Sequence, residues 1–424
     1  MIRIAVLGAG TAGTTIANRL ARRYADELSA GGLRITVVDQ DNRHVYQPGL
    51  LFLPFGDYTP DQITKKRSKQ LLPGITFTHA TIDRIDTQHD AVELADGQRI
   101  PYDVLVIASG SRTVPESIEG MKGEGWEEKV FDWYDIDSNI ALRDRLERMR
   151  RGRLVVQLAG MPIKCPGAPI EFAFLADAYF TQTGVREDVT ITYVTSQDAA
   201  FGRPALAQCF AELLEEKGVG LVTGFETARV DGRAGRLVAR DGREVAFDVL
   251  ASVPPHYGAD FVARTPGLGD GRNFVHTDMR TLQCTLKPNI FALGDAANLP
   301  TTKGGAVAHF EMEVAEGNIA RYLKGEPLDP GYDGHANGFI ETGFERAFYF
   351  EHNYDTEPMP GAFPIPAVGP LNQMQESHLN HLGRRAIRWM YWNVLLPGHD
   401  MPGVTPTMQG TAKRVGPLPV RDAP

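Results

Sequence analysis

The chain opens with Ile2-Arg-Ile-Ala-Val-Leu7, followed by Gly8-Ala-Gly10-Thr-Ala-Gly13, and this stretch decides the fold. The apolar run predicts a buried strand, and the residues after Gly13 have the spacing of a helix. In that setting Gly8 permits the tight turn, Gly10 lets the backbone approach a pyrophosphate, and Gly13 lets the helix lie close to the strand. A second strand ends at Asp39, whose carboxylate can accept hydrogen bonds from ribose hydroxyls. The opening therefore predicts a dinucleotide-binding unit.

The bulk composition limits the classes of function. A length of 424 residues favours two or three domains, and 42% apolar with 23% charged residues is typical of a globular protein. The net charge of −9 gives no support to nucleic-acid binding. Three cysteines favour a reducing compartment, and the strand that begins at the second residue leaves no room for a signal peptide. No apolar run reaches the roughly 18 residues of a spanning helix. We therefore expect a cytoplasmic protein without metal sites.

Two further strand ends indicate that the dinucleotide is FAD. A buried run from Tyr102 leads into Ser109-Gly110, and a late one leads into Gly294-Asp295. The Asp295 carboxylate can bind ribityl hydroxyls. A helix predicted over 306–323 can stabilise negative charge on a reduced flavin ring. Because these features lie far along the chain from the opening turn, they favour FAD over a single NAD.

Shorter patterns fill the space between these strands. Alternation over 75–100 predicts a small antiparallel meander, and the Asp-Gly turns within 224–247 predict hairpins. A charged helix is expected over 139–151. The basic run Lys65-Lys-Arg-Ser-Lys69 is typical of a solvated helix face.

A second strand–turn–helix unit has an altered turn. The strand over 154–159 and a helix over 171–179 enclose Gly160-Met-Pro-Ile-Lys-Cys165-Pro-Gly-Ala-Pro169. Prolines at 162, 166 and 169 remove N–H donors from the place where a nicotinamide nucleotide needs its glycine turn. We expect NAD(P)H binding to be weak or absent.

Cys165 occupies this turn between Lys164 and a helix start. Both the ammonium group and the helix dipole favour the nucleophilic thiolate. The alternative is an inert packing residue. We expect Cys209, on an amphipathic helix, and Cys284, before a strand, to be such residues.

These motifs carry a resemblance to a known family. The opening glycines, Cys165-Pro-Gly-Ala-Pro-Ile-Glu171 and the run from Ala292 to Ala306 resemble the sulfide:quinone oxidoreductase and flavocytochrome c sulfide dehydrogenase group of two-dinucleotide-domain flavoproteins. The resemblance implies an α/β fold with two Rossmann-like dinucleotide-binding domains, small antiparallel β insertions and a C-terminal region that ends in an amphipathic helix. It implies an FAD domain over 1–112 and 280–325, a second Rossmann-like domain over 113–279, and a C-terminal region over 326–424.

The same resemblance implies an activity and its residues. Sulfide or a protein-bound persulfide gives electrons through Cys165 and FAD to a quinone. Glu171 matches an acid that assists proton movement, and Lys303 matches a lysine beside the flavin and the quinone pocket. The second redox cysteine of the family aligns with Gly338. A flavin-containing sulfur-relay or binding protein without turnover of free sulfide is therefore the alternative, and an NADH:quinone oxidoreductase is a third.

Three histidines and the C-terminal helix complete the expectations. His256, His309 and His335 are either proton carriers or structural residues. Arg384, Arg385 and Arg388 open a helix over 381–397 that is rich in aromatic residues and suits a membrane interface on the inner face of the cytoplasmic membrane, with its basic face toward headgroups. Docking of this helix on the protein's own core or on a second copy in a homodimer is the alternative.

Overall fold

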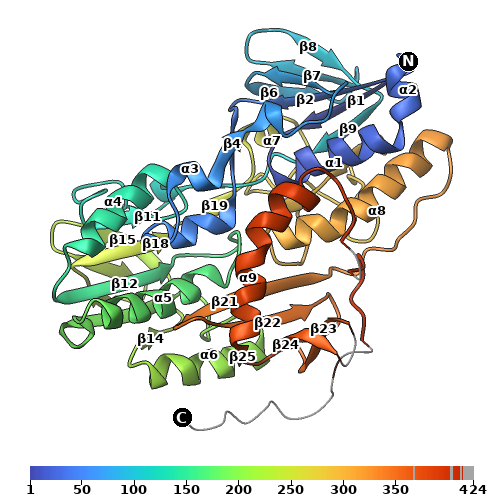
Figure 1. Cartoon of the computed structure of the whole chain (residues 1–424). Coiled ribbons are helices and arrows are strands. Elements are labelled where there is room, and N and C mark those ends of the chain that lie inside the picture. Colours follow the sequence, from blue (N-terminus) through green and yellow to red (C-terminus); the bar gives the residue numbers. More distant parts are fainter. Residues whose placement is uncertain (366–367, 402–403, 411–412, 414–424) are drawn as a thin grey trace.

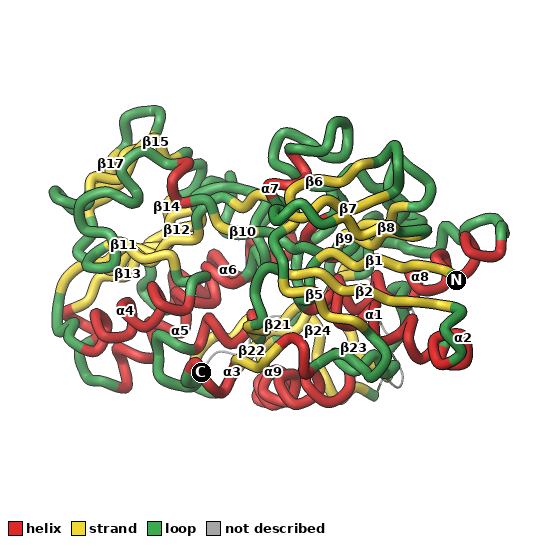
Figure 2. The backbone as a smooth tube through the Cα atoms, turned by 90° about the horizontal axis from the view of Figure 1, so that it is seen from above, coloured by secondary structure: helices red, strands yellow, loops and turns green. Residues whose placement is uncertain are grey.

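Two parallel sheets and one mixed sheet form the frame of the molecule (Figure 1). The computed structural model describes residues 1–365, 368–401, 404–410 and 413. Seen from above, the two parallel sheets stand side by side, and the mixed sheet lies between and below them (Figure 2). The chain therefore has the two Rossmann-like units and the further C-terminal region that the sequence predicts.

The first sheet contains the opening strand at its centre. Its five parallel strands, in spatial order, are β20 (Ile290–Ala292), β9 (Val104–Ile107), β1 (Ile2–Leu7), β2 (Leu33–Asp39) and β5 (Thr76–His79). Helices α1 (Thr11–Arg23) and α8 (Gly305–Lys324) pack against each other beside this sheet, and α2 (Ala25–Ser29) follows α1. Strand β9 and its neighbour β20 are wholly buried, as expected for a parallel sheet covered on both faces.

The second sheet repeats this plan. Its parallel strands, in spatial order, are β11 (Val130–Asp132), β18 (Val249–Val253), β12 (Gly152–Leu158), β13 (Val189–Thr195) and β14 (Gly220–Val222). Its helices are α4 (Ile136–Glu147), α5 (Ala168–Gln182) and α6 (Pro204–Glu216). Each parallel sheet has an antiparallel insertion of three strands. These are β6 (Ile82–Asp86), β7 (Ala91–Leu94) and β8 (Arg99–Pro101), and β15 (Thr227–Asp231), β16 (Arg236–Ala239) and β17 (Glu244–Ala246).

The mixed sheet is C-terminal. Its strands are β21 (Ala336–Gly343), β22 (Arg346–His352), β24 (Gly369–Gln373) and β23 (Gly361–Ile365), and β25 (Glu376–Ser377) pairs with β22. Helix α9 (His378–Met390) crosses this sheet and continues as a π-helical turn over Tyr391–Leu395. The minor elements are β3 (Arg43–Val45), β4 (Thr64–Lys66), β10 (Arg112–Thr113), β19 (His256–Tyr257), α3 (Pro60–Ile63) and α7 (Asp260–Ala263). Strand β21 packs on α5, so the C-terminal region contacts the altered turn.

Some local predictions are wrong. Residues 76–79 of the expected meander join the parallel sheet as β5, because their pairing partner is β2. The basic run over 65–69 is not a helix face: it forms β4 and a 3-10 turn, since β4 pairs with β3. Among the described residues, no helix combines the length and the apolar character required to cross a bilayer.

Candidate functional site

The opening turn has the geometry of a phosphate-binding turn. Gly8 has φ 99°, and a Cβ added there would lie 2.4 Å from the Ala108 carbonyl oxygen. A Cβ at Gly13 would lie 1.8 Å from the Gly8 carbonyl oxygen, so only glycine lets α1 approach β1 this closely. At Gly10 an added Cβ would meet no described atom within 4 Å. The backbone at Gly10 is therefore open to a ligand, as a pyrophosphate requires.

The other residues expected to hold FAD surround the same opening. The side-chain oxygens of Ser109 and Ser111 are buried and lack a hydrogen-bond partner in the described part of the chain. Gly110 and Gly294 have φ 69° and 62°. Gly304 and Gly305 open helix α8, and Cβ atoms built there would meet open space among the described residues. These orphaned hydroxyls and uncovered glycine turns fit FAD, and the N–H groups at the start of α8 would offer hydrogen-bond donors to it.

Asp39 is more heavily engaged than the sequence suggests. Its carboxylate accepts hydrogen bonds from the Ala9 N–H at 2.7 Å and the Asp41 N–H at 3.0 Å. The guanidinium of Arg67 also donates to it. Arg67 belongs to the basic run that was expected to be solvated, so that prediction is wrong for this residue. The role of Asp39 toward a ribose stays a prediction.

Cys165 lies at the head of α5 in a left-handed conformation, with φ 48°. Its N–H donates to the carbonyl oxygen of Lys303 at 2.7 Å, and its own carbonyl accepts from the Ala168 N–H at 2.9 Å. The hydroxyl of Tyr134 donates to the Lys164 carbonyl at 2.5 Å. The backbone thus brings the cysteine of the second unit against the lysine segment of the first.

The expectation that Lys164 favours the thiolate is wrong. The Lys164 ammonium donates to Gln47 at 3.3 Å and faces Asp295 and Asp132. Cys165 itself is exposed to solvent. Desolvation by the surrounding protein, followed by the charge of Glu171, raises the pKa of the Cys165 thiol to about 11. The thiol is therefore protonated at neutral pH and needs a base.

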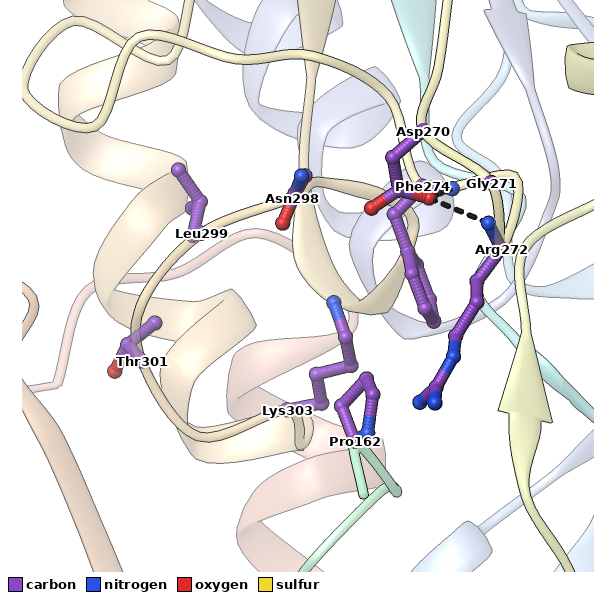
Figure 3. A pocket seen from close by; sticks show the side chains of 9 residues that line it. All are labelled: Pro162, Asp270, Gly271, Arg272, Phe274, Asn298, Leu299, Thr301 and Lys303. Carbon is purple, nitrogen blue, oxygen red and sulfur yellow. Dashed lines mark hydrogen bonds between the residues drawn. The ribbon is translucent and has the colours of Figure 1, made fainter. Parts of the chain in front are cut away.

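Lys303 joins the two units. Its ammonium group donates to the carbonyl oxygens of Ala297 at 2.7 Å and Asp295 at 3.1 Å, and lies 4.0 Å from the ring centre of Phe274. Burial raises the pKa of Asp295 and lowers that of Lys303. A cavity of about 360 Å³ opens beside Lys303 (Figure 3). It is lined by Pro162, Asp270, Gly271, Arg272, Phe274, Asn298, Leu299, Thr301 and Lys303.

Glu171 lies on the first turn of α5 and is fully buried. One carboxylate oxygen accepts from the Glu341 N–H at 3.0 Å, and the same oxygen lies 3.7 Å from a guanidinium nitrogen of Arg384. Burial raises the pKa of Glu171 to about 7, while Arg384 opposes the rise. The pKa of Glu171 thus lies near neutral pH, and its charge acts on the Cys165 thiol.

Sequence reasoning missed two residues of this region. Arg384 turns inward to Glu171, although it stands in a run of arginines that looks solvated. Glu311 of α8 is buried and accepts the Gly294 N–H. A charged residue in an otherwise apolar helical stretch was the available signal for Glu311. No pattern within α9 distinguishes Arg384 from Arg385.

The other cysteines lie away from this turn. Cys284 is buried in the core of the first sheet, next to Ile290, whose carbonyl accepts its N–H at 2.8 Å. Cys209 packs against the core of the second sheet. Gly338 lies in β21, and a Cβ added there would lie 2.9 Å from the Phe350 ring. Phe350 therefore fills the space into which a cysteine at position 338 would project.

The three histidines have structural contacts. His256 is buried, contacts the Pro254 carbonyl at 3.0 Å and stands edge-on to Tyr134. His309 is buried on α8, which lowers its pKa to about 4. His335 stacks on Phe310 with ring centres 3.8 Å apart. Their role as proton carriers stays a prediction, and His256 is the one that lies by the Cys165 turn through Tyr134.

The fold and these turns define a class of flavoprotein. The family model described as pyridine nucleotide-disulphide oxidoreductase matches residues 2–311, and the chain belongs to this family. It is therefore an FAD-dependent oxidoreductase with two Rossmann-like units, as the sequence predicts.

Particular relatives narrow the comparison. The chain is 24% identical to the mitochondrial sulfide:quinone oxidoreductase of Mus musculus over 405 residues, covering 93% of this chain and 86% of the relative. It is 24% identical over 368 residues to the type II NADH:quinone oxidoreductase of Haemophilus influenzae, covering 77% of this chain and 82% of that relative. The crystal structure of the Aquifex aeolicus sulfide:quinone oxidoreductase matches with a TM-score of 0.75 at 20% identity, covering 93% of this chain and 92% of that one. The resemblance to sulfide:quinone oxidoreductases is thus shared by sequence and fold.

Proposed function

We propose that this protein is a sulfide:quinone oxidoreductase-like enzyme that passes electrons from a sulfur species through Cys165 and FAD to a quinone. One observation carries the proposal: a cysteine occupies the second turn, and its N–H is bonded at 2.7 Å to the backbone of Lys303, in the segment that follows the flavin-binding Gly294-Asp295. In this position a cysteine takes the place of the glycine turn that would bind the phosphates of a nicotinamide nucleotide. The relatives named for sulfide and quinone support the same assignment.

Each residue has a proposed role. Glu171 takes the proton of Cys165, whose sulfur then bonds to the sulfur of H₂S. One hydrogen leaves each sulfur, so two electrons and two protons are released, and a quinone takes up both to become a quinol. FAD, when bound, supplies the two-electron relay between thiol and quinone. Lys303, which donates to the Asp295 carbonyl, would be among the residues that hold FAD and would supply positive charge to stabilise negative charge on it.

The test is anaerobic mixing of the purified yellow protein with sulfide. Wild type is expected to lose its flavin absorbance and to regain it when a quinone is added. Cys165→Ser is expected to bleach at least about 100-fold more slowly, because it lacks the reacting sulfur. Cys284→Ser, which removes a buried thiol from another core, is the matched control and keeps the wild-type rate. Bleaching that is equally fast in Cys165→Ser contradicts the proposal.

The same assay separates the alternatives. The sulfur-relay function is favoured by Phe350, which fills the place of a second cysteine at position 338. It predicts bleaching by a protein-bound persulfide but not by free sulfide. The NADH:quinone oxidoreductase function predicts bleaching by NADH at micromolar concentration. We expect none, since prolines interrupt the second turn.

Peripheral membrane binding through α9 is part of the proposal. Leu379, Leu382 and Trp389 are 50%, 50% and 65% exposed and recur along one face of the helix. Trp389 is thus exposed, as an interfacial aromatic residue must be, whereas Tyr391 and Trp392 pack inward against Tyr46. A quinone is met at a membrane, and an exposed apolar helix face suits its interface.

The measurement is sedimentation with lipid vesicles. Replacing Leu379, Leu382 and Trp389 by Gln together is expected to lower vesicle binding at least tenfold, because three apolar side chains no longer enter the interface. The FAD content should be unchanged, since these side chains face away from the core. Equal binding of the variant would leave docking on a second copy as the role of this face.

A further inference from the structure

Helix α9 carries one arginine that faces the protein interior. The Arg384 side chain is 10% exposed and the Glu171 side chain 1%, and a guanidinium nitrogen lies 3.7 Å from a Glu171 carboxylate oxygen. The guanidinium also lies over the Phe52 ring, 5.2 Å from its centre. Arg384 therefore reaches from the C-terminal helix to the acid beside Cys165. Two neighbouring arginines take other positions: Arg385 is exposed, and Arg388 lies over Tyr58.

This ion pair has unused hydrogen-bonding capacity on both sides. The second Glu171 oxygen is buried and accepts no hydrogen bond from any described residue. The Arg384 Nε–H is likewise buried without an acceptor among them. Purely structural buried pairs normally satisfy such atoms, because an unsatisfied polar atom is costly. The spare atoms instead leave the carboxylate able to take a proton.

Several charged or titratable groups face Glu171 from the elements around it. Arg384 approaches from α9, Glu341 from β21, Tyr46 from the loop before residues 47–52, and Cys165 and Tyr134 from the second unit. Glu341 is held on its far side by His381 at 2.9 Å. Arg384 and the Glu341 N–H favour the ionised form of Glu171, whereas burial and the charge of the Glu341 carboxylate oppose it. Arg384 also acts on the thiol, whose pKa it lowers.

We propose that Arg384 is a positioning residue for the thiol site: its guanidinium holds the Glu171 carboxylate in the orientation and charge state in which it accepts the proton of Cys165. This role of Arg384 rests on the proposed function, in which Cys165 reacts with a sulfur species. The link between Arg384 and Glu171 is nevertheless measurable without any sulfide chemistry. The membrane-facing helix therefore supplies part of the site on its inward face.

The experiment is an infrared titration of the FAD-loaded protein. The carbonyl band of protonated Glu171 is identified by its loss in Glu171→Gln, and its midpoint is expected near pH 7 in wild type. In Arg384→Met the midpoint should rise by at least about one pH unit, a tenfold increase in proton affinity, because the cation that stabilises the carboxylate is gone. Arg384→Gln, a polar neutral side chain, is measured in parallel in case the methionine variant does not fold.

Two variants act as controls. Arg384→Lys keeps the charge and is expected to restore most of the wild-type midpoint, which a merely structural role does not predict. Arg385→Met removes an exposed neighbour and should leave the midpoint unchanged. An unmoved midpoint in the neutral Arg384 variants, or a shift in Arg384→Lys as large as theirs, overturns the inference. If the midpoint shifts but wild type is not bleached by sulfide, the proposed function fails and the positioning role stands.

Discussion

The two strand–turn–helix units of this chain occupy equivalent places in their sheets, yet their turns are built for different tasks. In the first, Gly10 is open to solvent and the turn is set for a phosphate. In the second, a Cβ at Gly167 would lie 2.3 Å from Ile340 of β21, and the Cys165 N–H is already bonded to Lys303. The second turn is therefore closed by the C-terminal sheet and the flavin-side loop. One architecture can present either backbone donors or a thiol.

The largest predicted effect is a difference between the two turns in their tolerance of an added methyl group. Gly13→Ala places a Cβ 1.8 Å from the Gly8 carbonyl oxygen, so backbone must move. We expect a loss of about 3 kcal/mol or more, a fall in Tm of roughly 10 °C and loss of bound FAD. Gly160→Ala, whose Cβ would lie 3.6 Å from Pro255, should change Tm by no more than about 2 °C.

Calorimetry and the flavin absorbance of the purified variants measure both effects. Equal melting temperatures for the two variants would show that the first turn is not the tighter one. Retention of FAD in Gly13→Ala would also remove the argument that close packing of α1 on β1 forms the cofactor site.

A second thiol at position 338, where the family resemblance aligns a cysteine, would give the closed turn a partner for Cys165. Gly338 and Ile340 share one face of β21, and Ile340 packs on Gly167, two residues beyond Cys165. Because Phe350 fills this space, the variant combines Gly338→Cys with Phe350→Leu. We expect free-sulfide bleaching to become about tenfold faster, and oxidation to remove two titratable thiols. The matched control is Phe350→Leu alone. Unchanged thiol counts would show that position 338 cannot reach Cys165.

The sequence predicted the parts of this protein that depend on local chain geometry. Gly8, Gly10 and Gly13 predict their turn because no other residue meets its steric demands, and the structure has these contacts. The family and its cofactor follow from that turn and from Gly294-Asp295. Cys165 was located by its place in the second turn. The domain boundaries and the roles of the site residues stay predictions.

The parts that sequence could not supply depend on long-range packing. The pKa of the Cys165 thiol is raised by desolvation and by Glu171, which no local pattern reveals. Arg67 and Arg384 look like solvated charges, but tertiary contacts turn them toward Asp39 and Glu171. Which residues of α9 face inward depends on the elements that it packs against, and the sequence of the helix does not show these. Amphipathic periodicity identified the helix, but it did not show that Arg384 faces inward while Arg385 and Trp389 are exposed.

The last predicted effect concerns Glu311, which holds the Gly294 turn of the first Rossmann-like unit through a hydrogen bond. It is buried on α8 and accepts the Gly294 N–H, and burial raises its pKa to about 8. In the unfolded state Glu311 has its ordinary pKa of 4.5. Between pH 4.5 and about pH 8 the folded protein therefore keeps a proton on Glu311 that the unfolded protein has released. Stability must then fall as pH rises from about 4.5 to about 8. Glu311→Gln keeps an acceptor for Gly294 without the buried charge, so its gain in Tm over wild type should grow from almost nothing at pH 4 to its full value at pH 9. Melting curves of both proteins across this range measure the difference. A gain that is the same at both ends would mean that the pKa of Glu311 is the same in the folded and the unfolded protein.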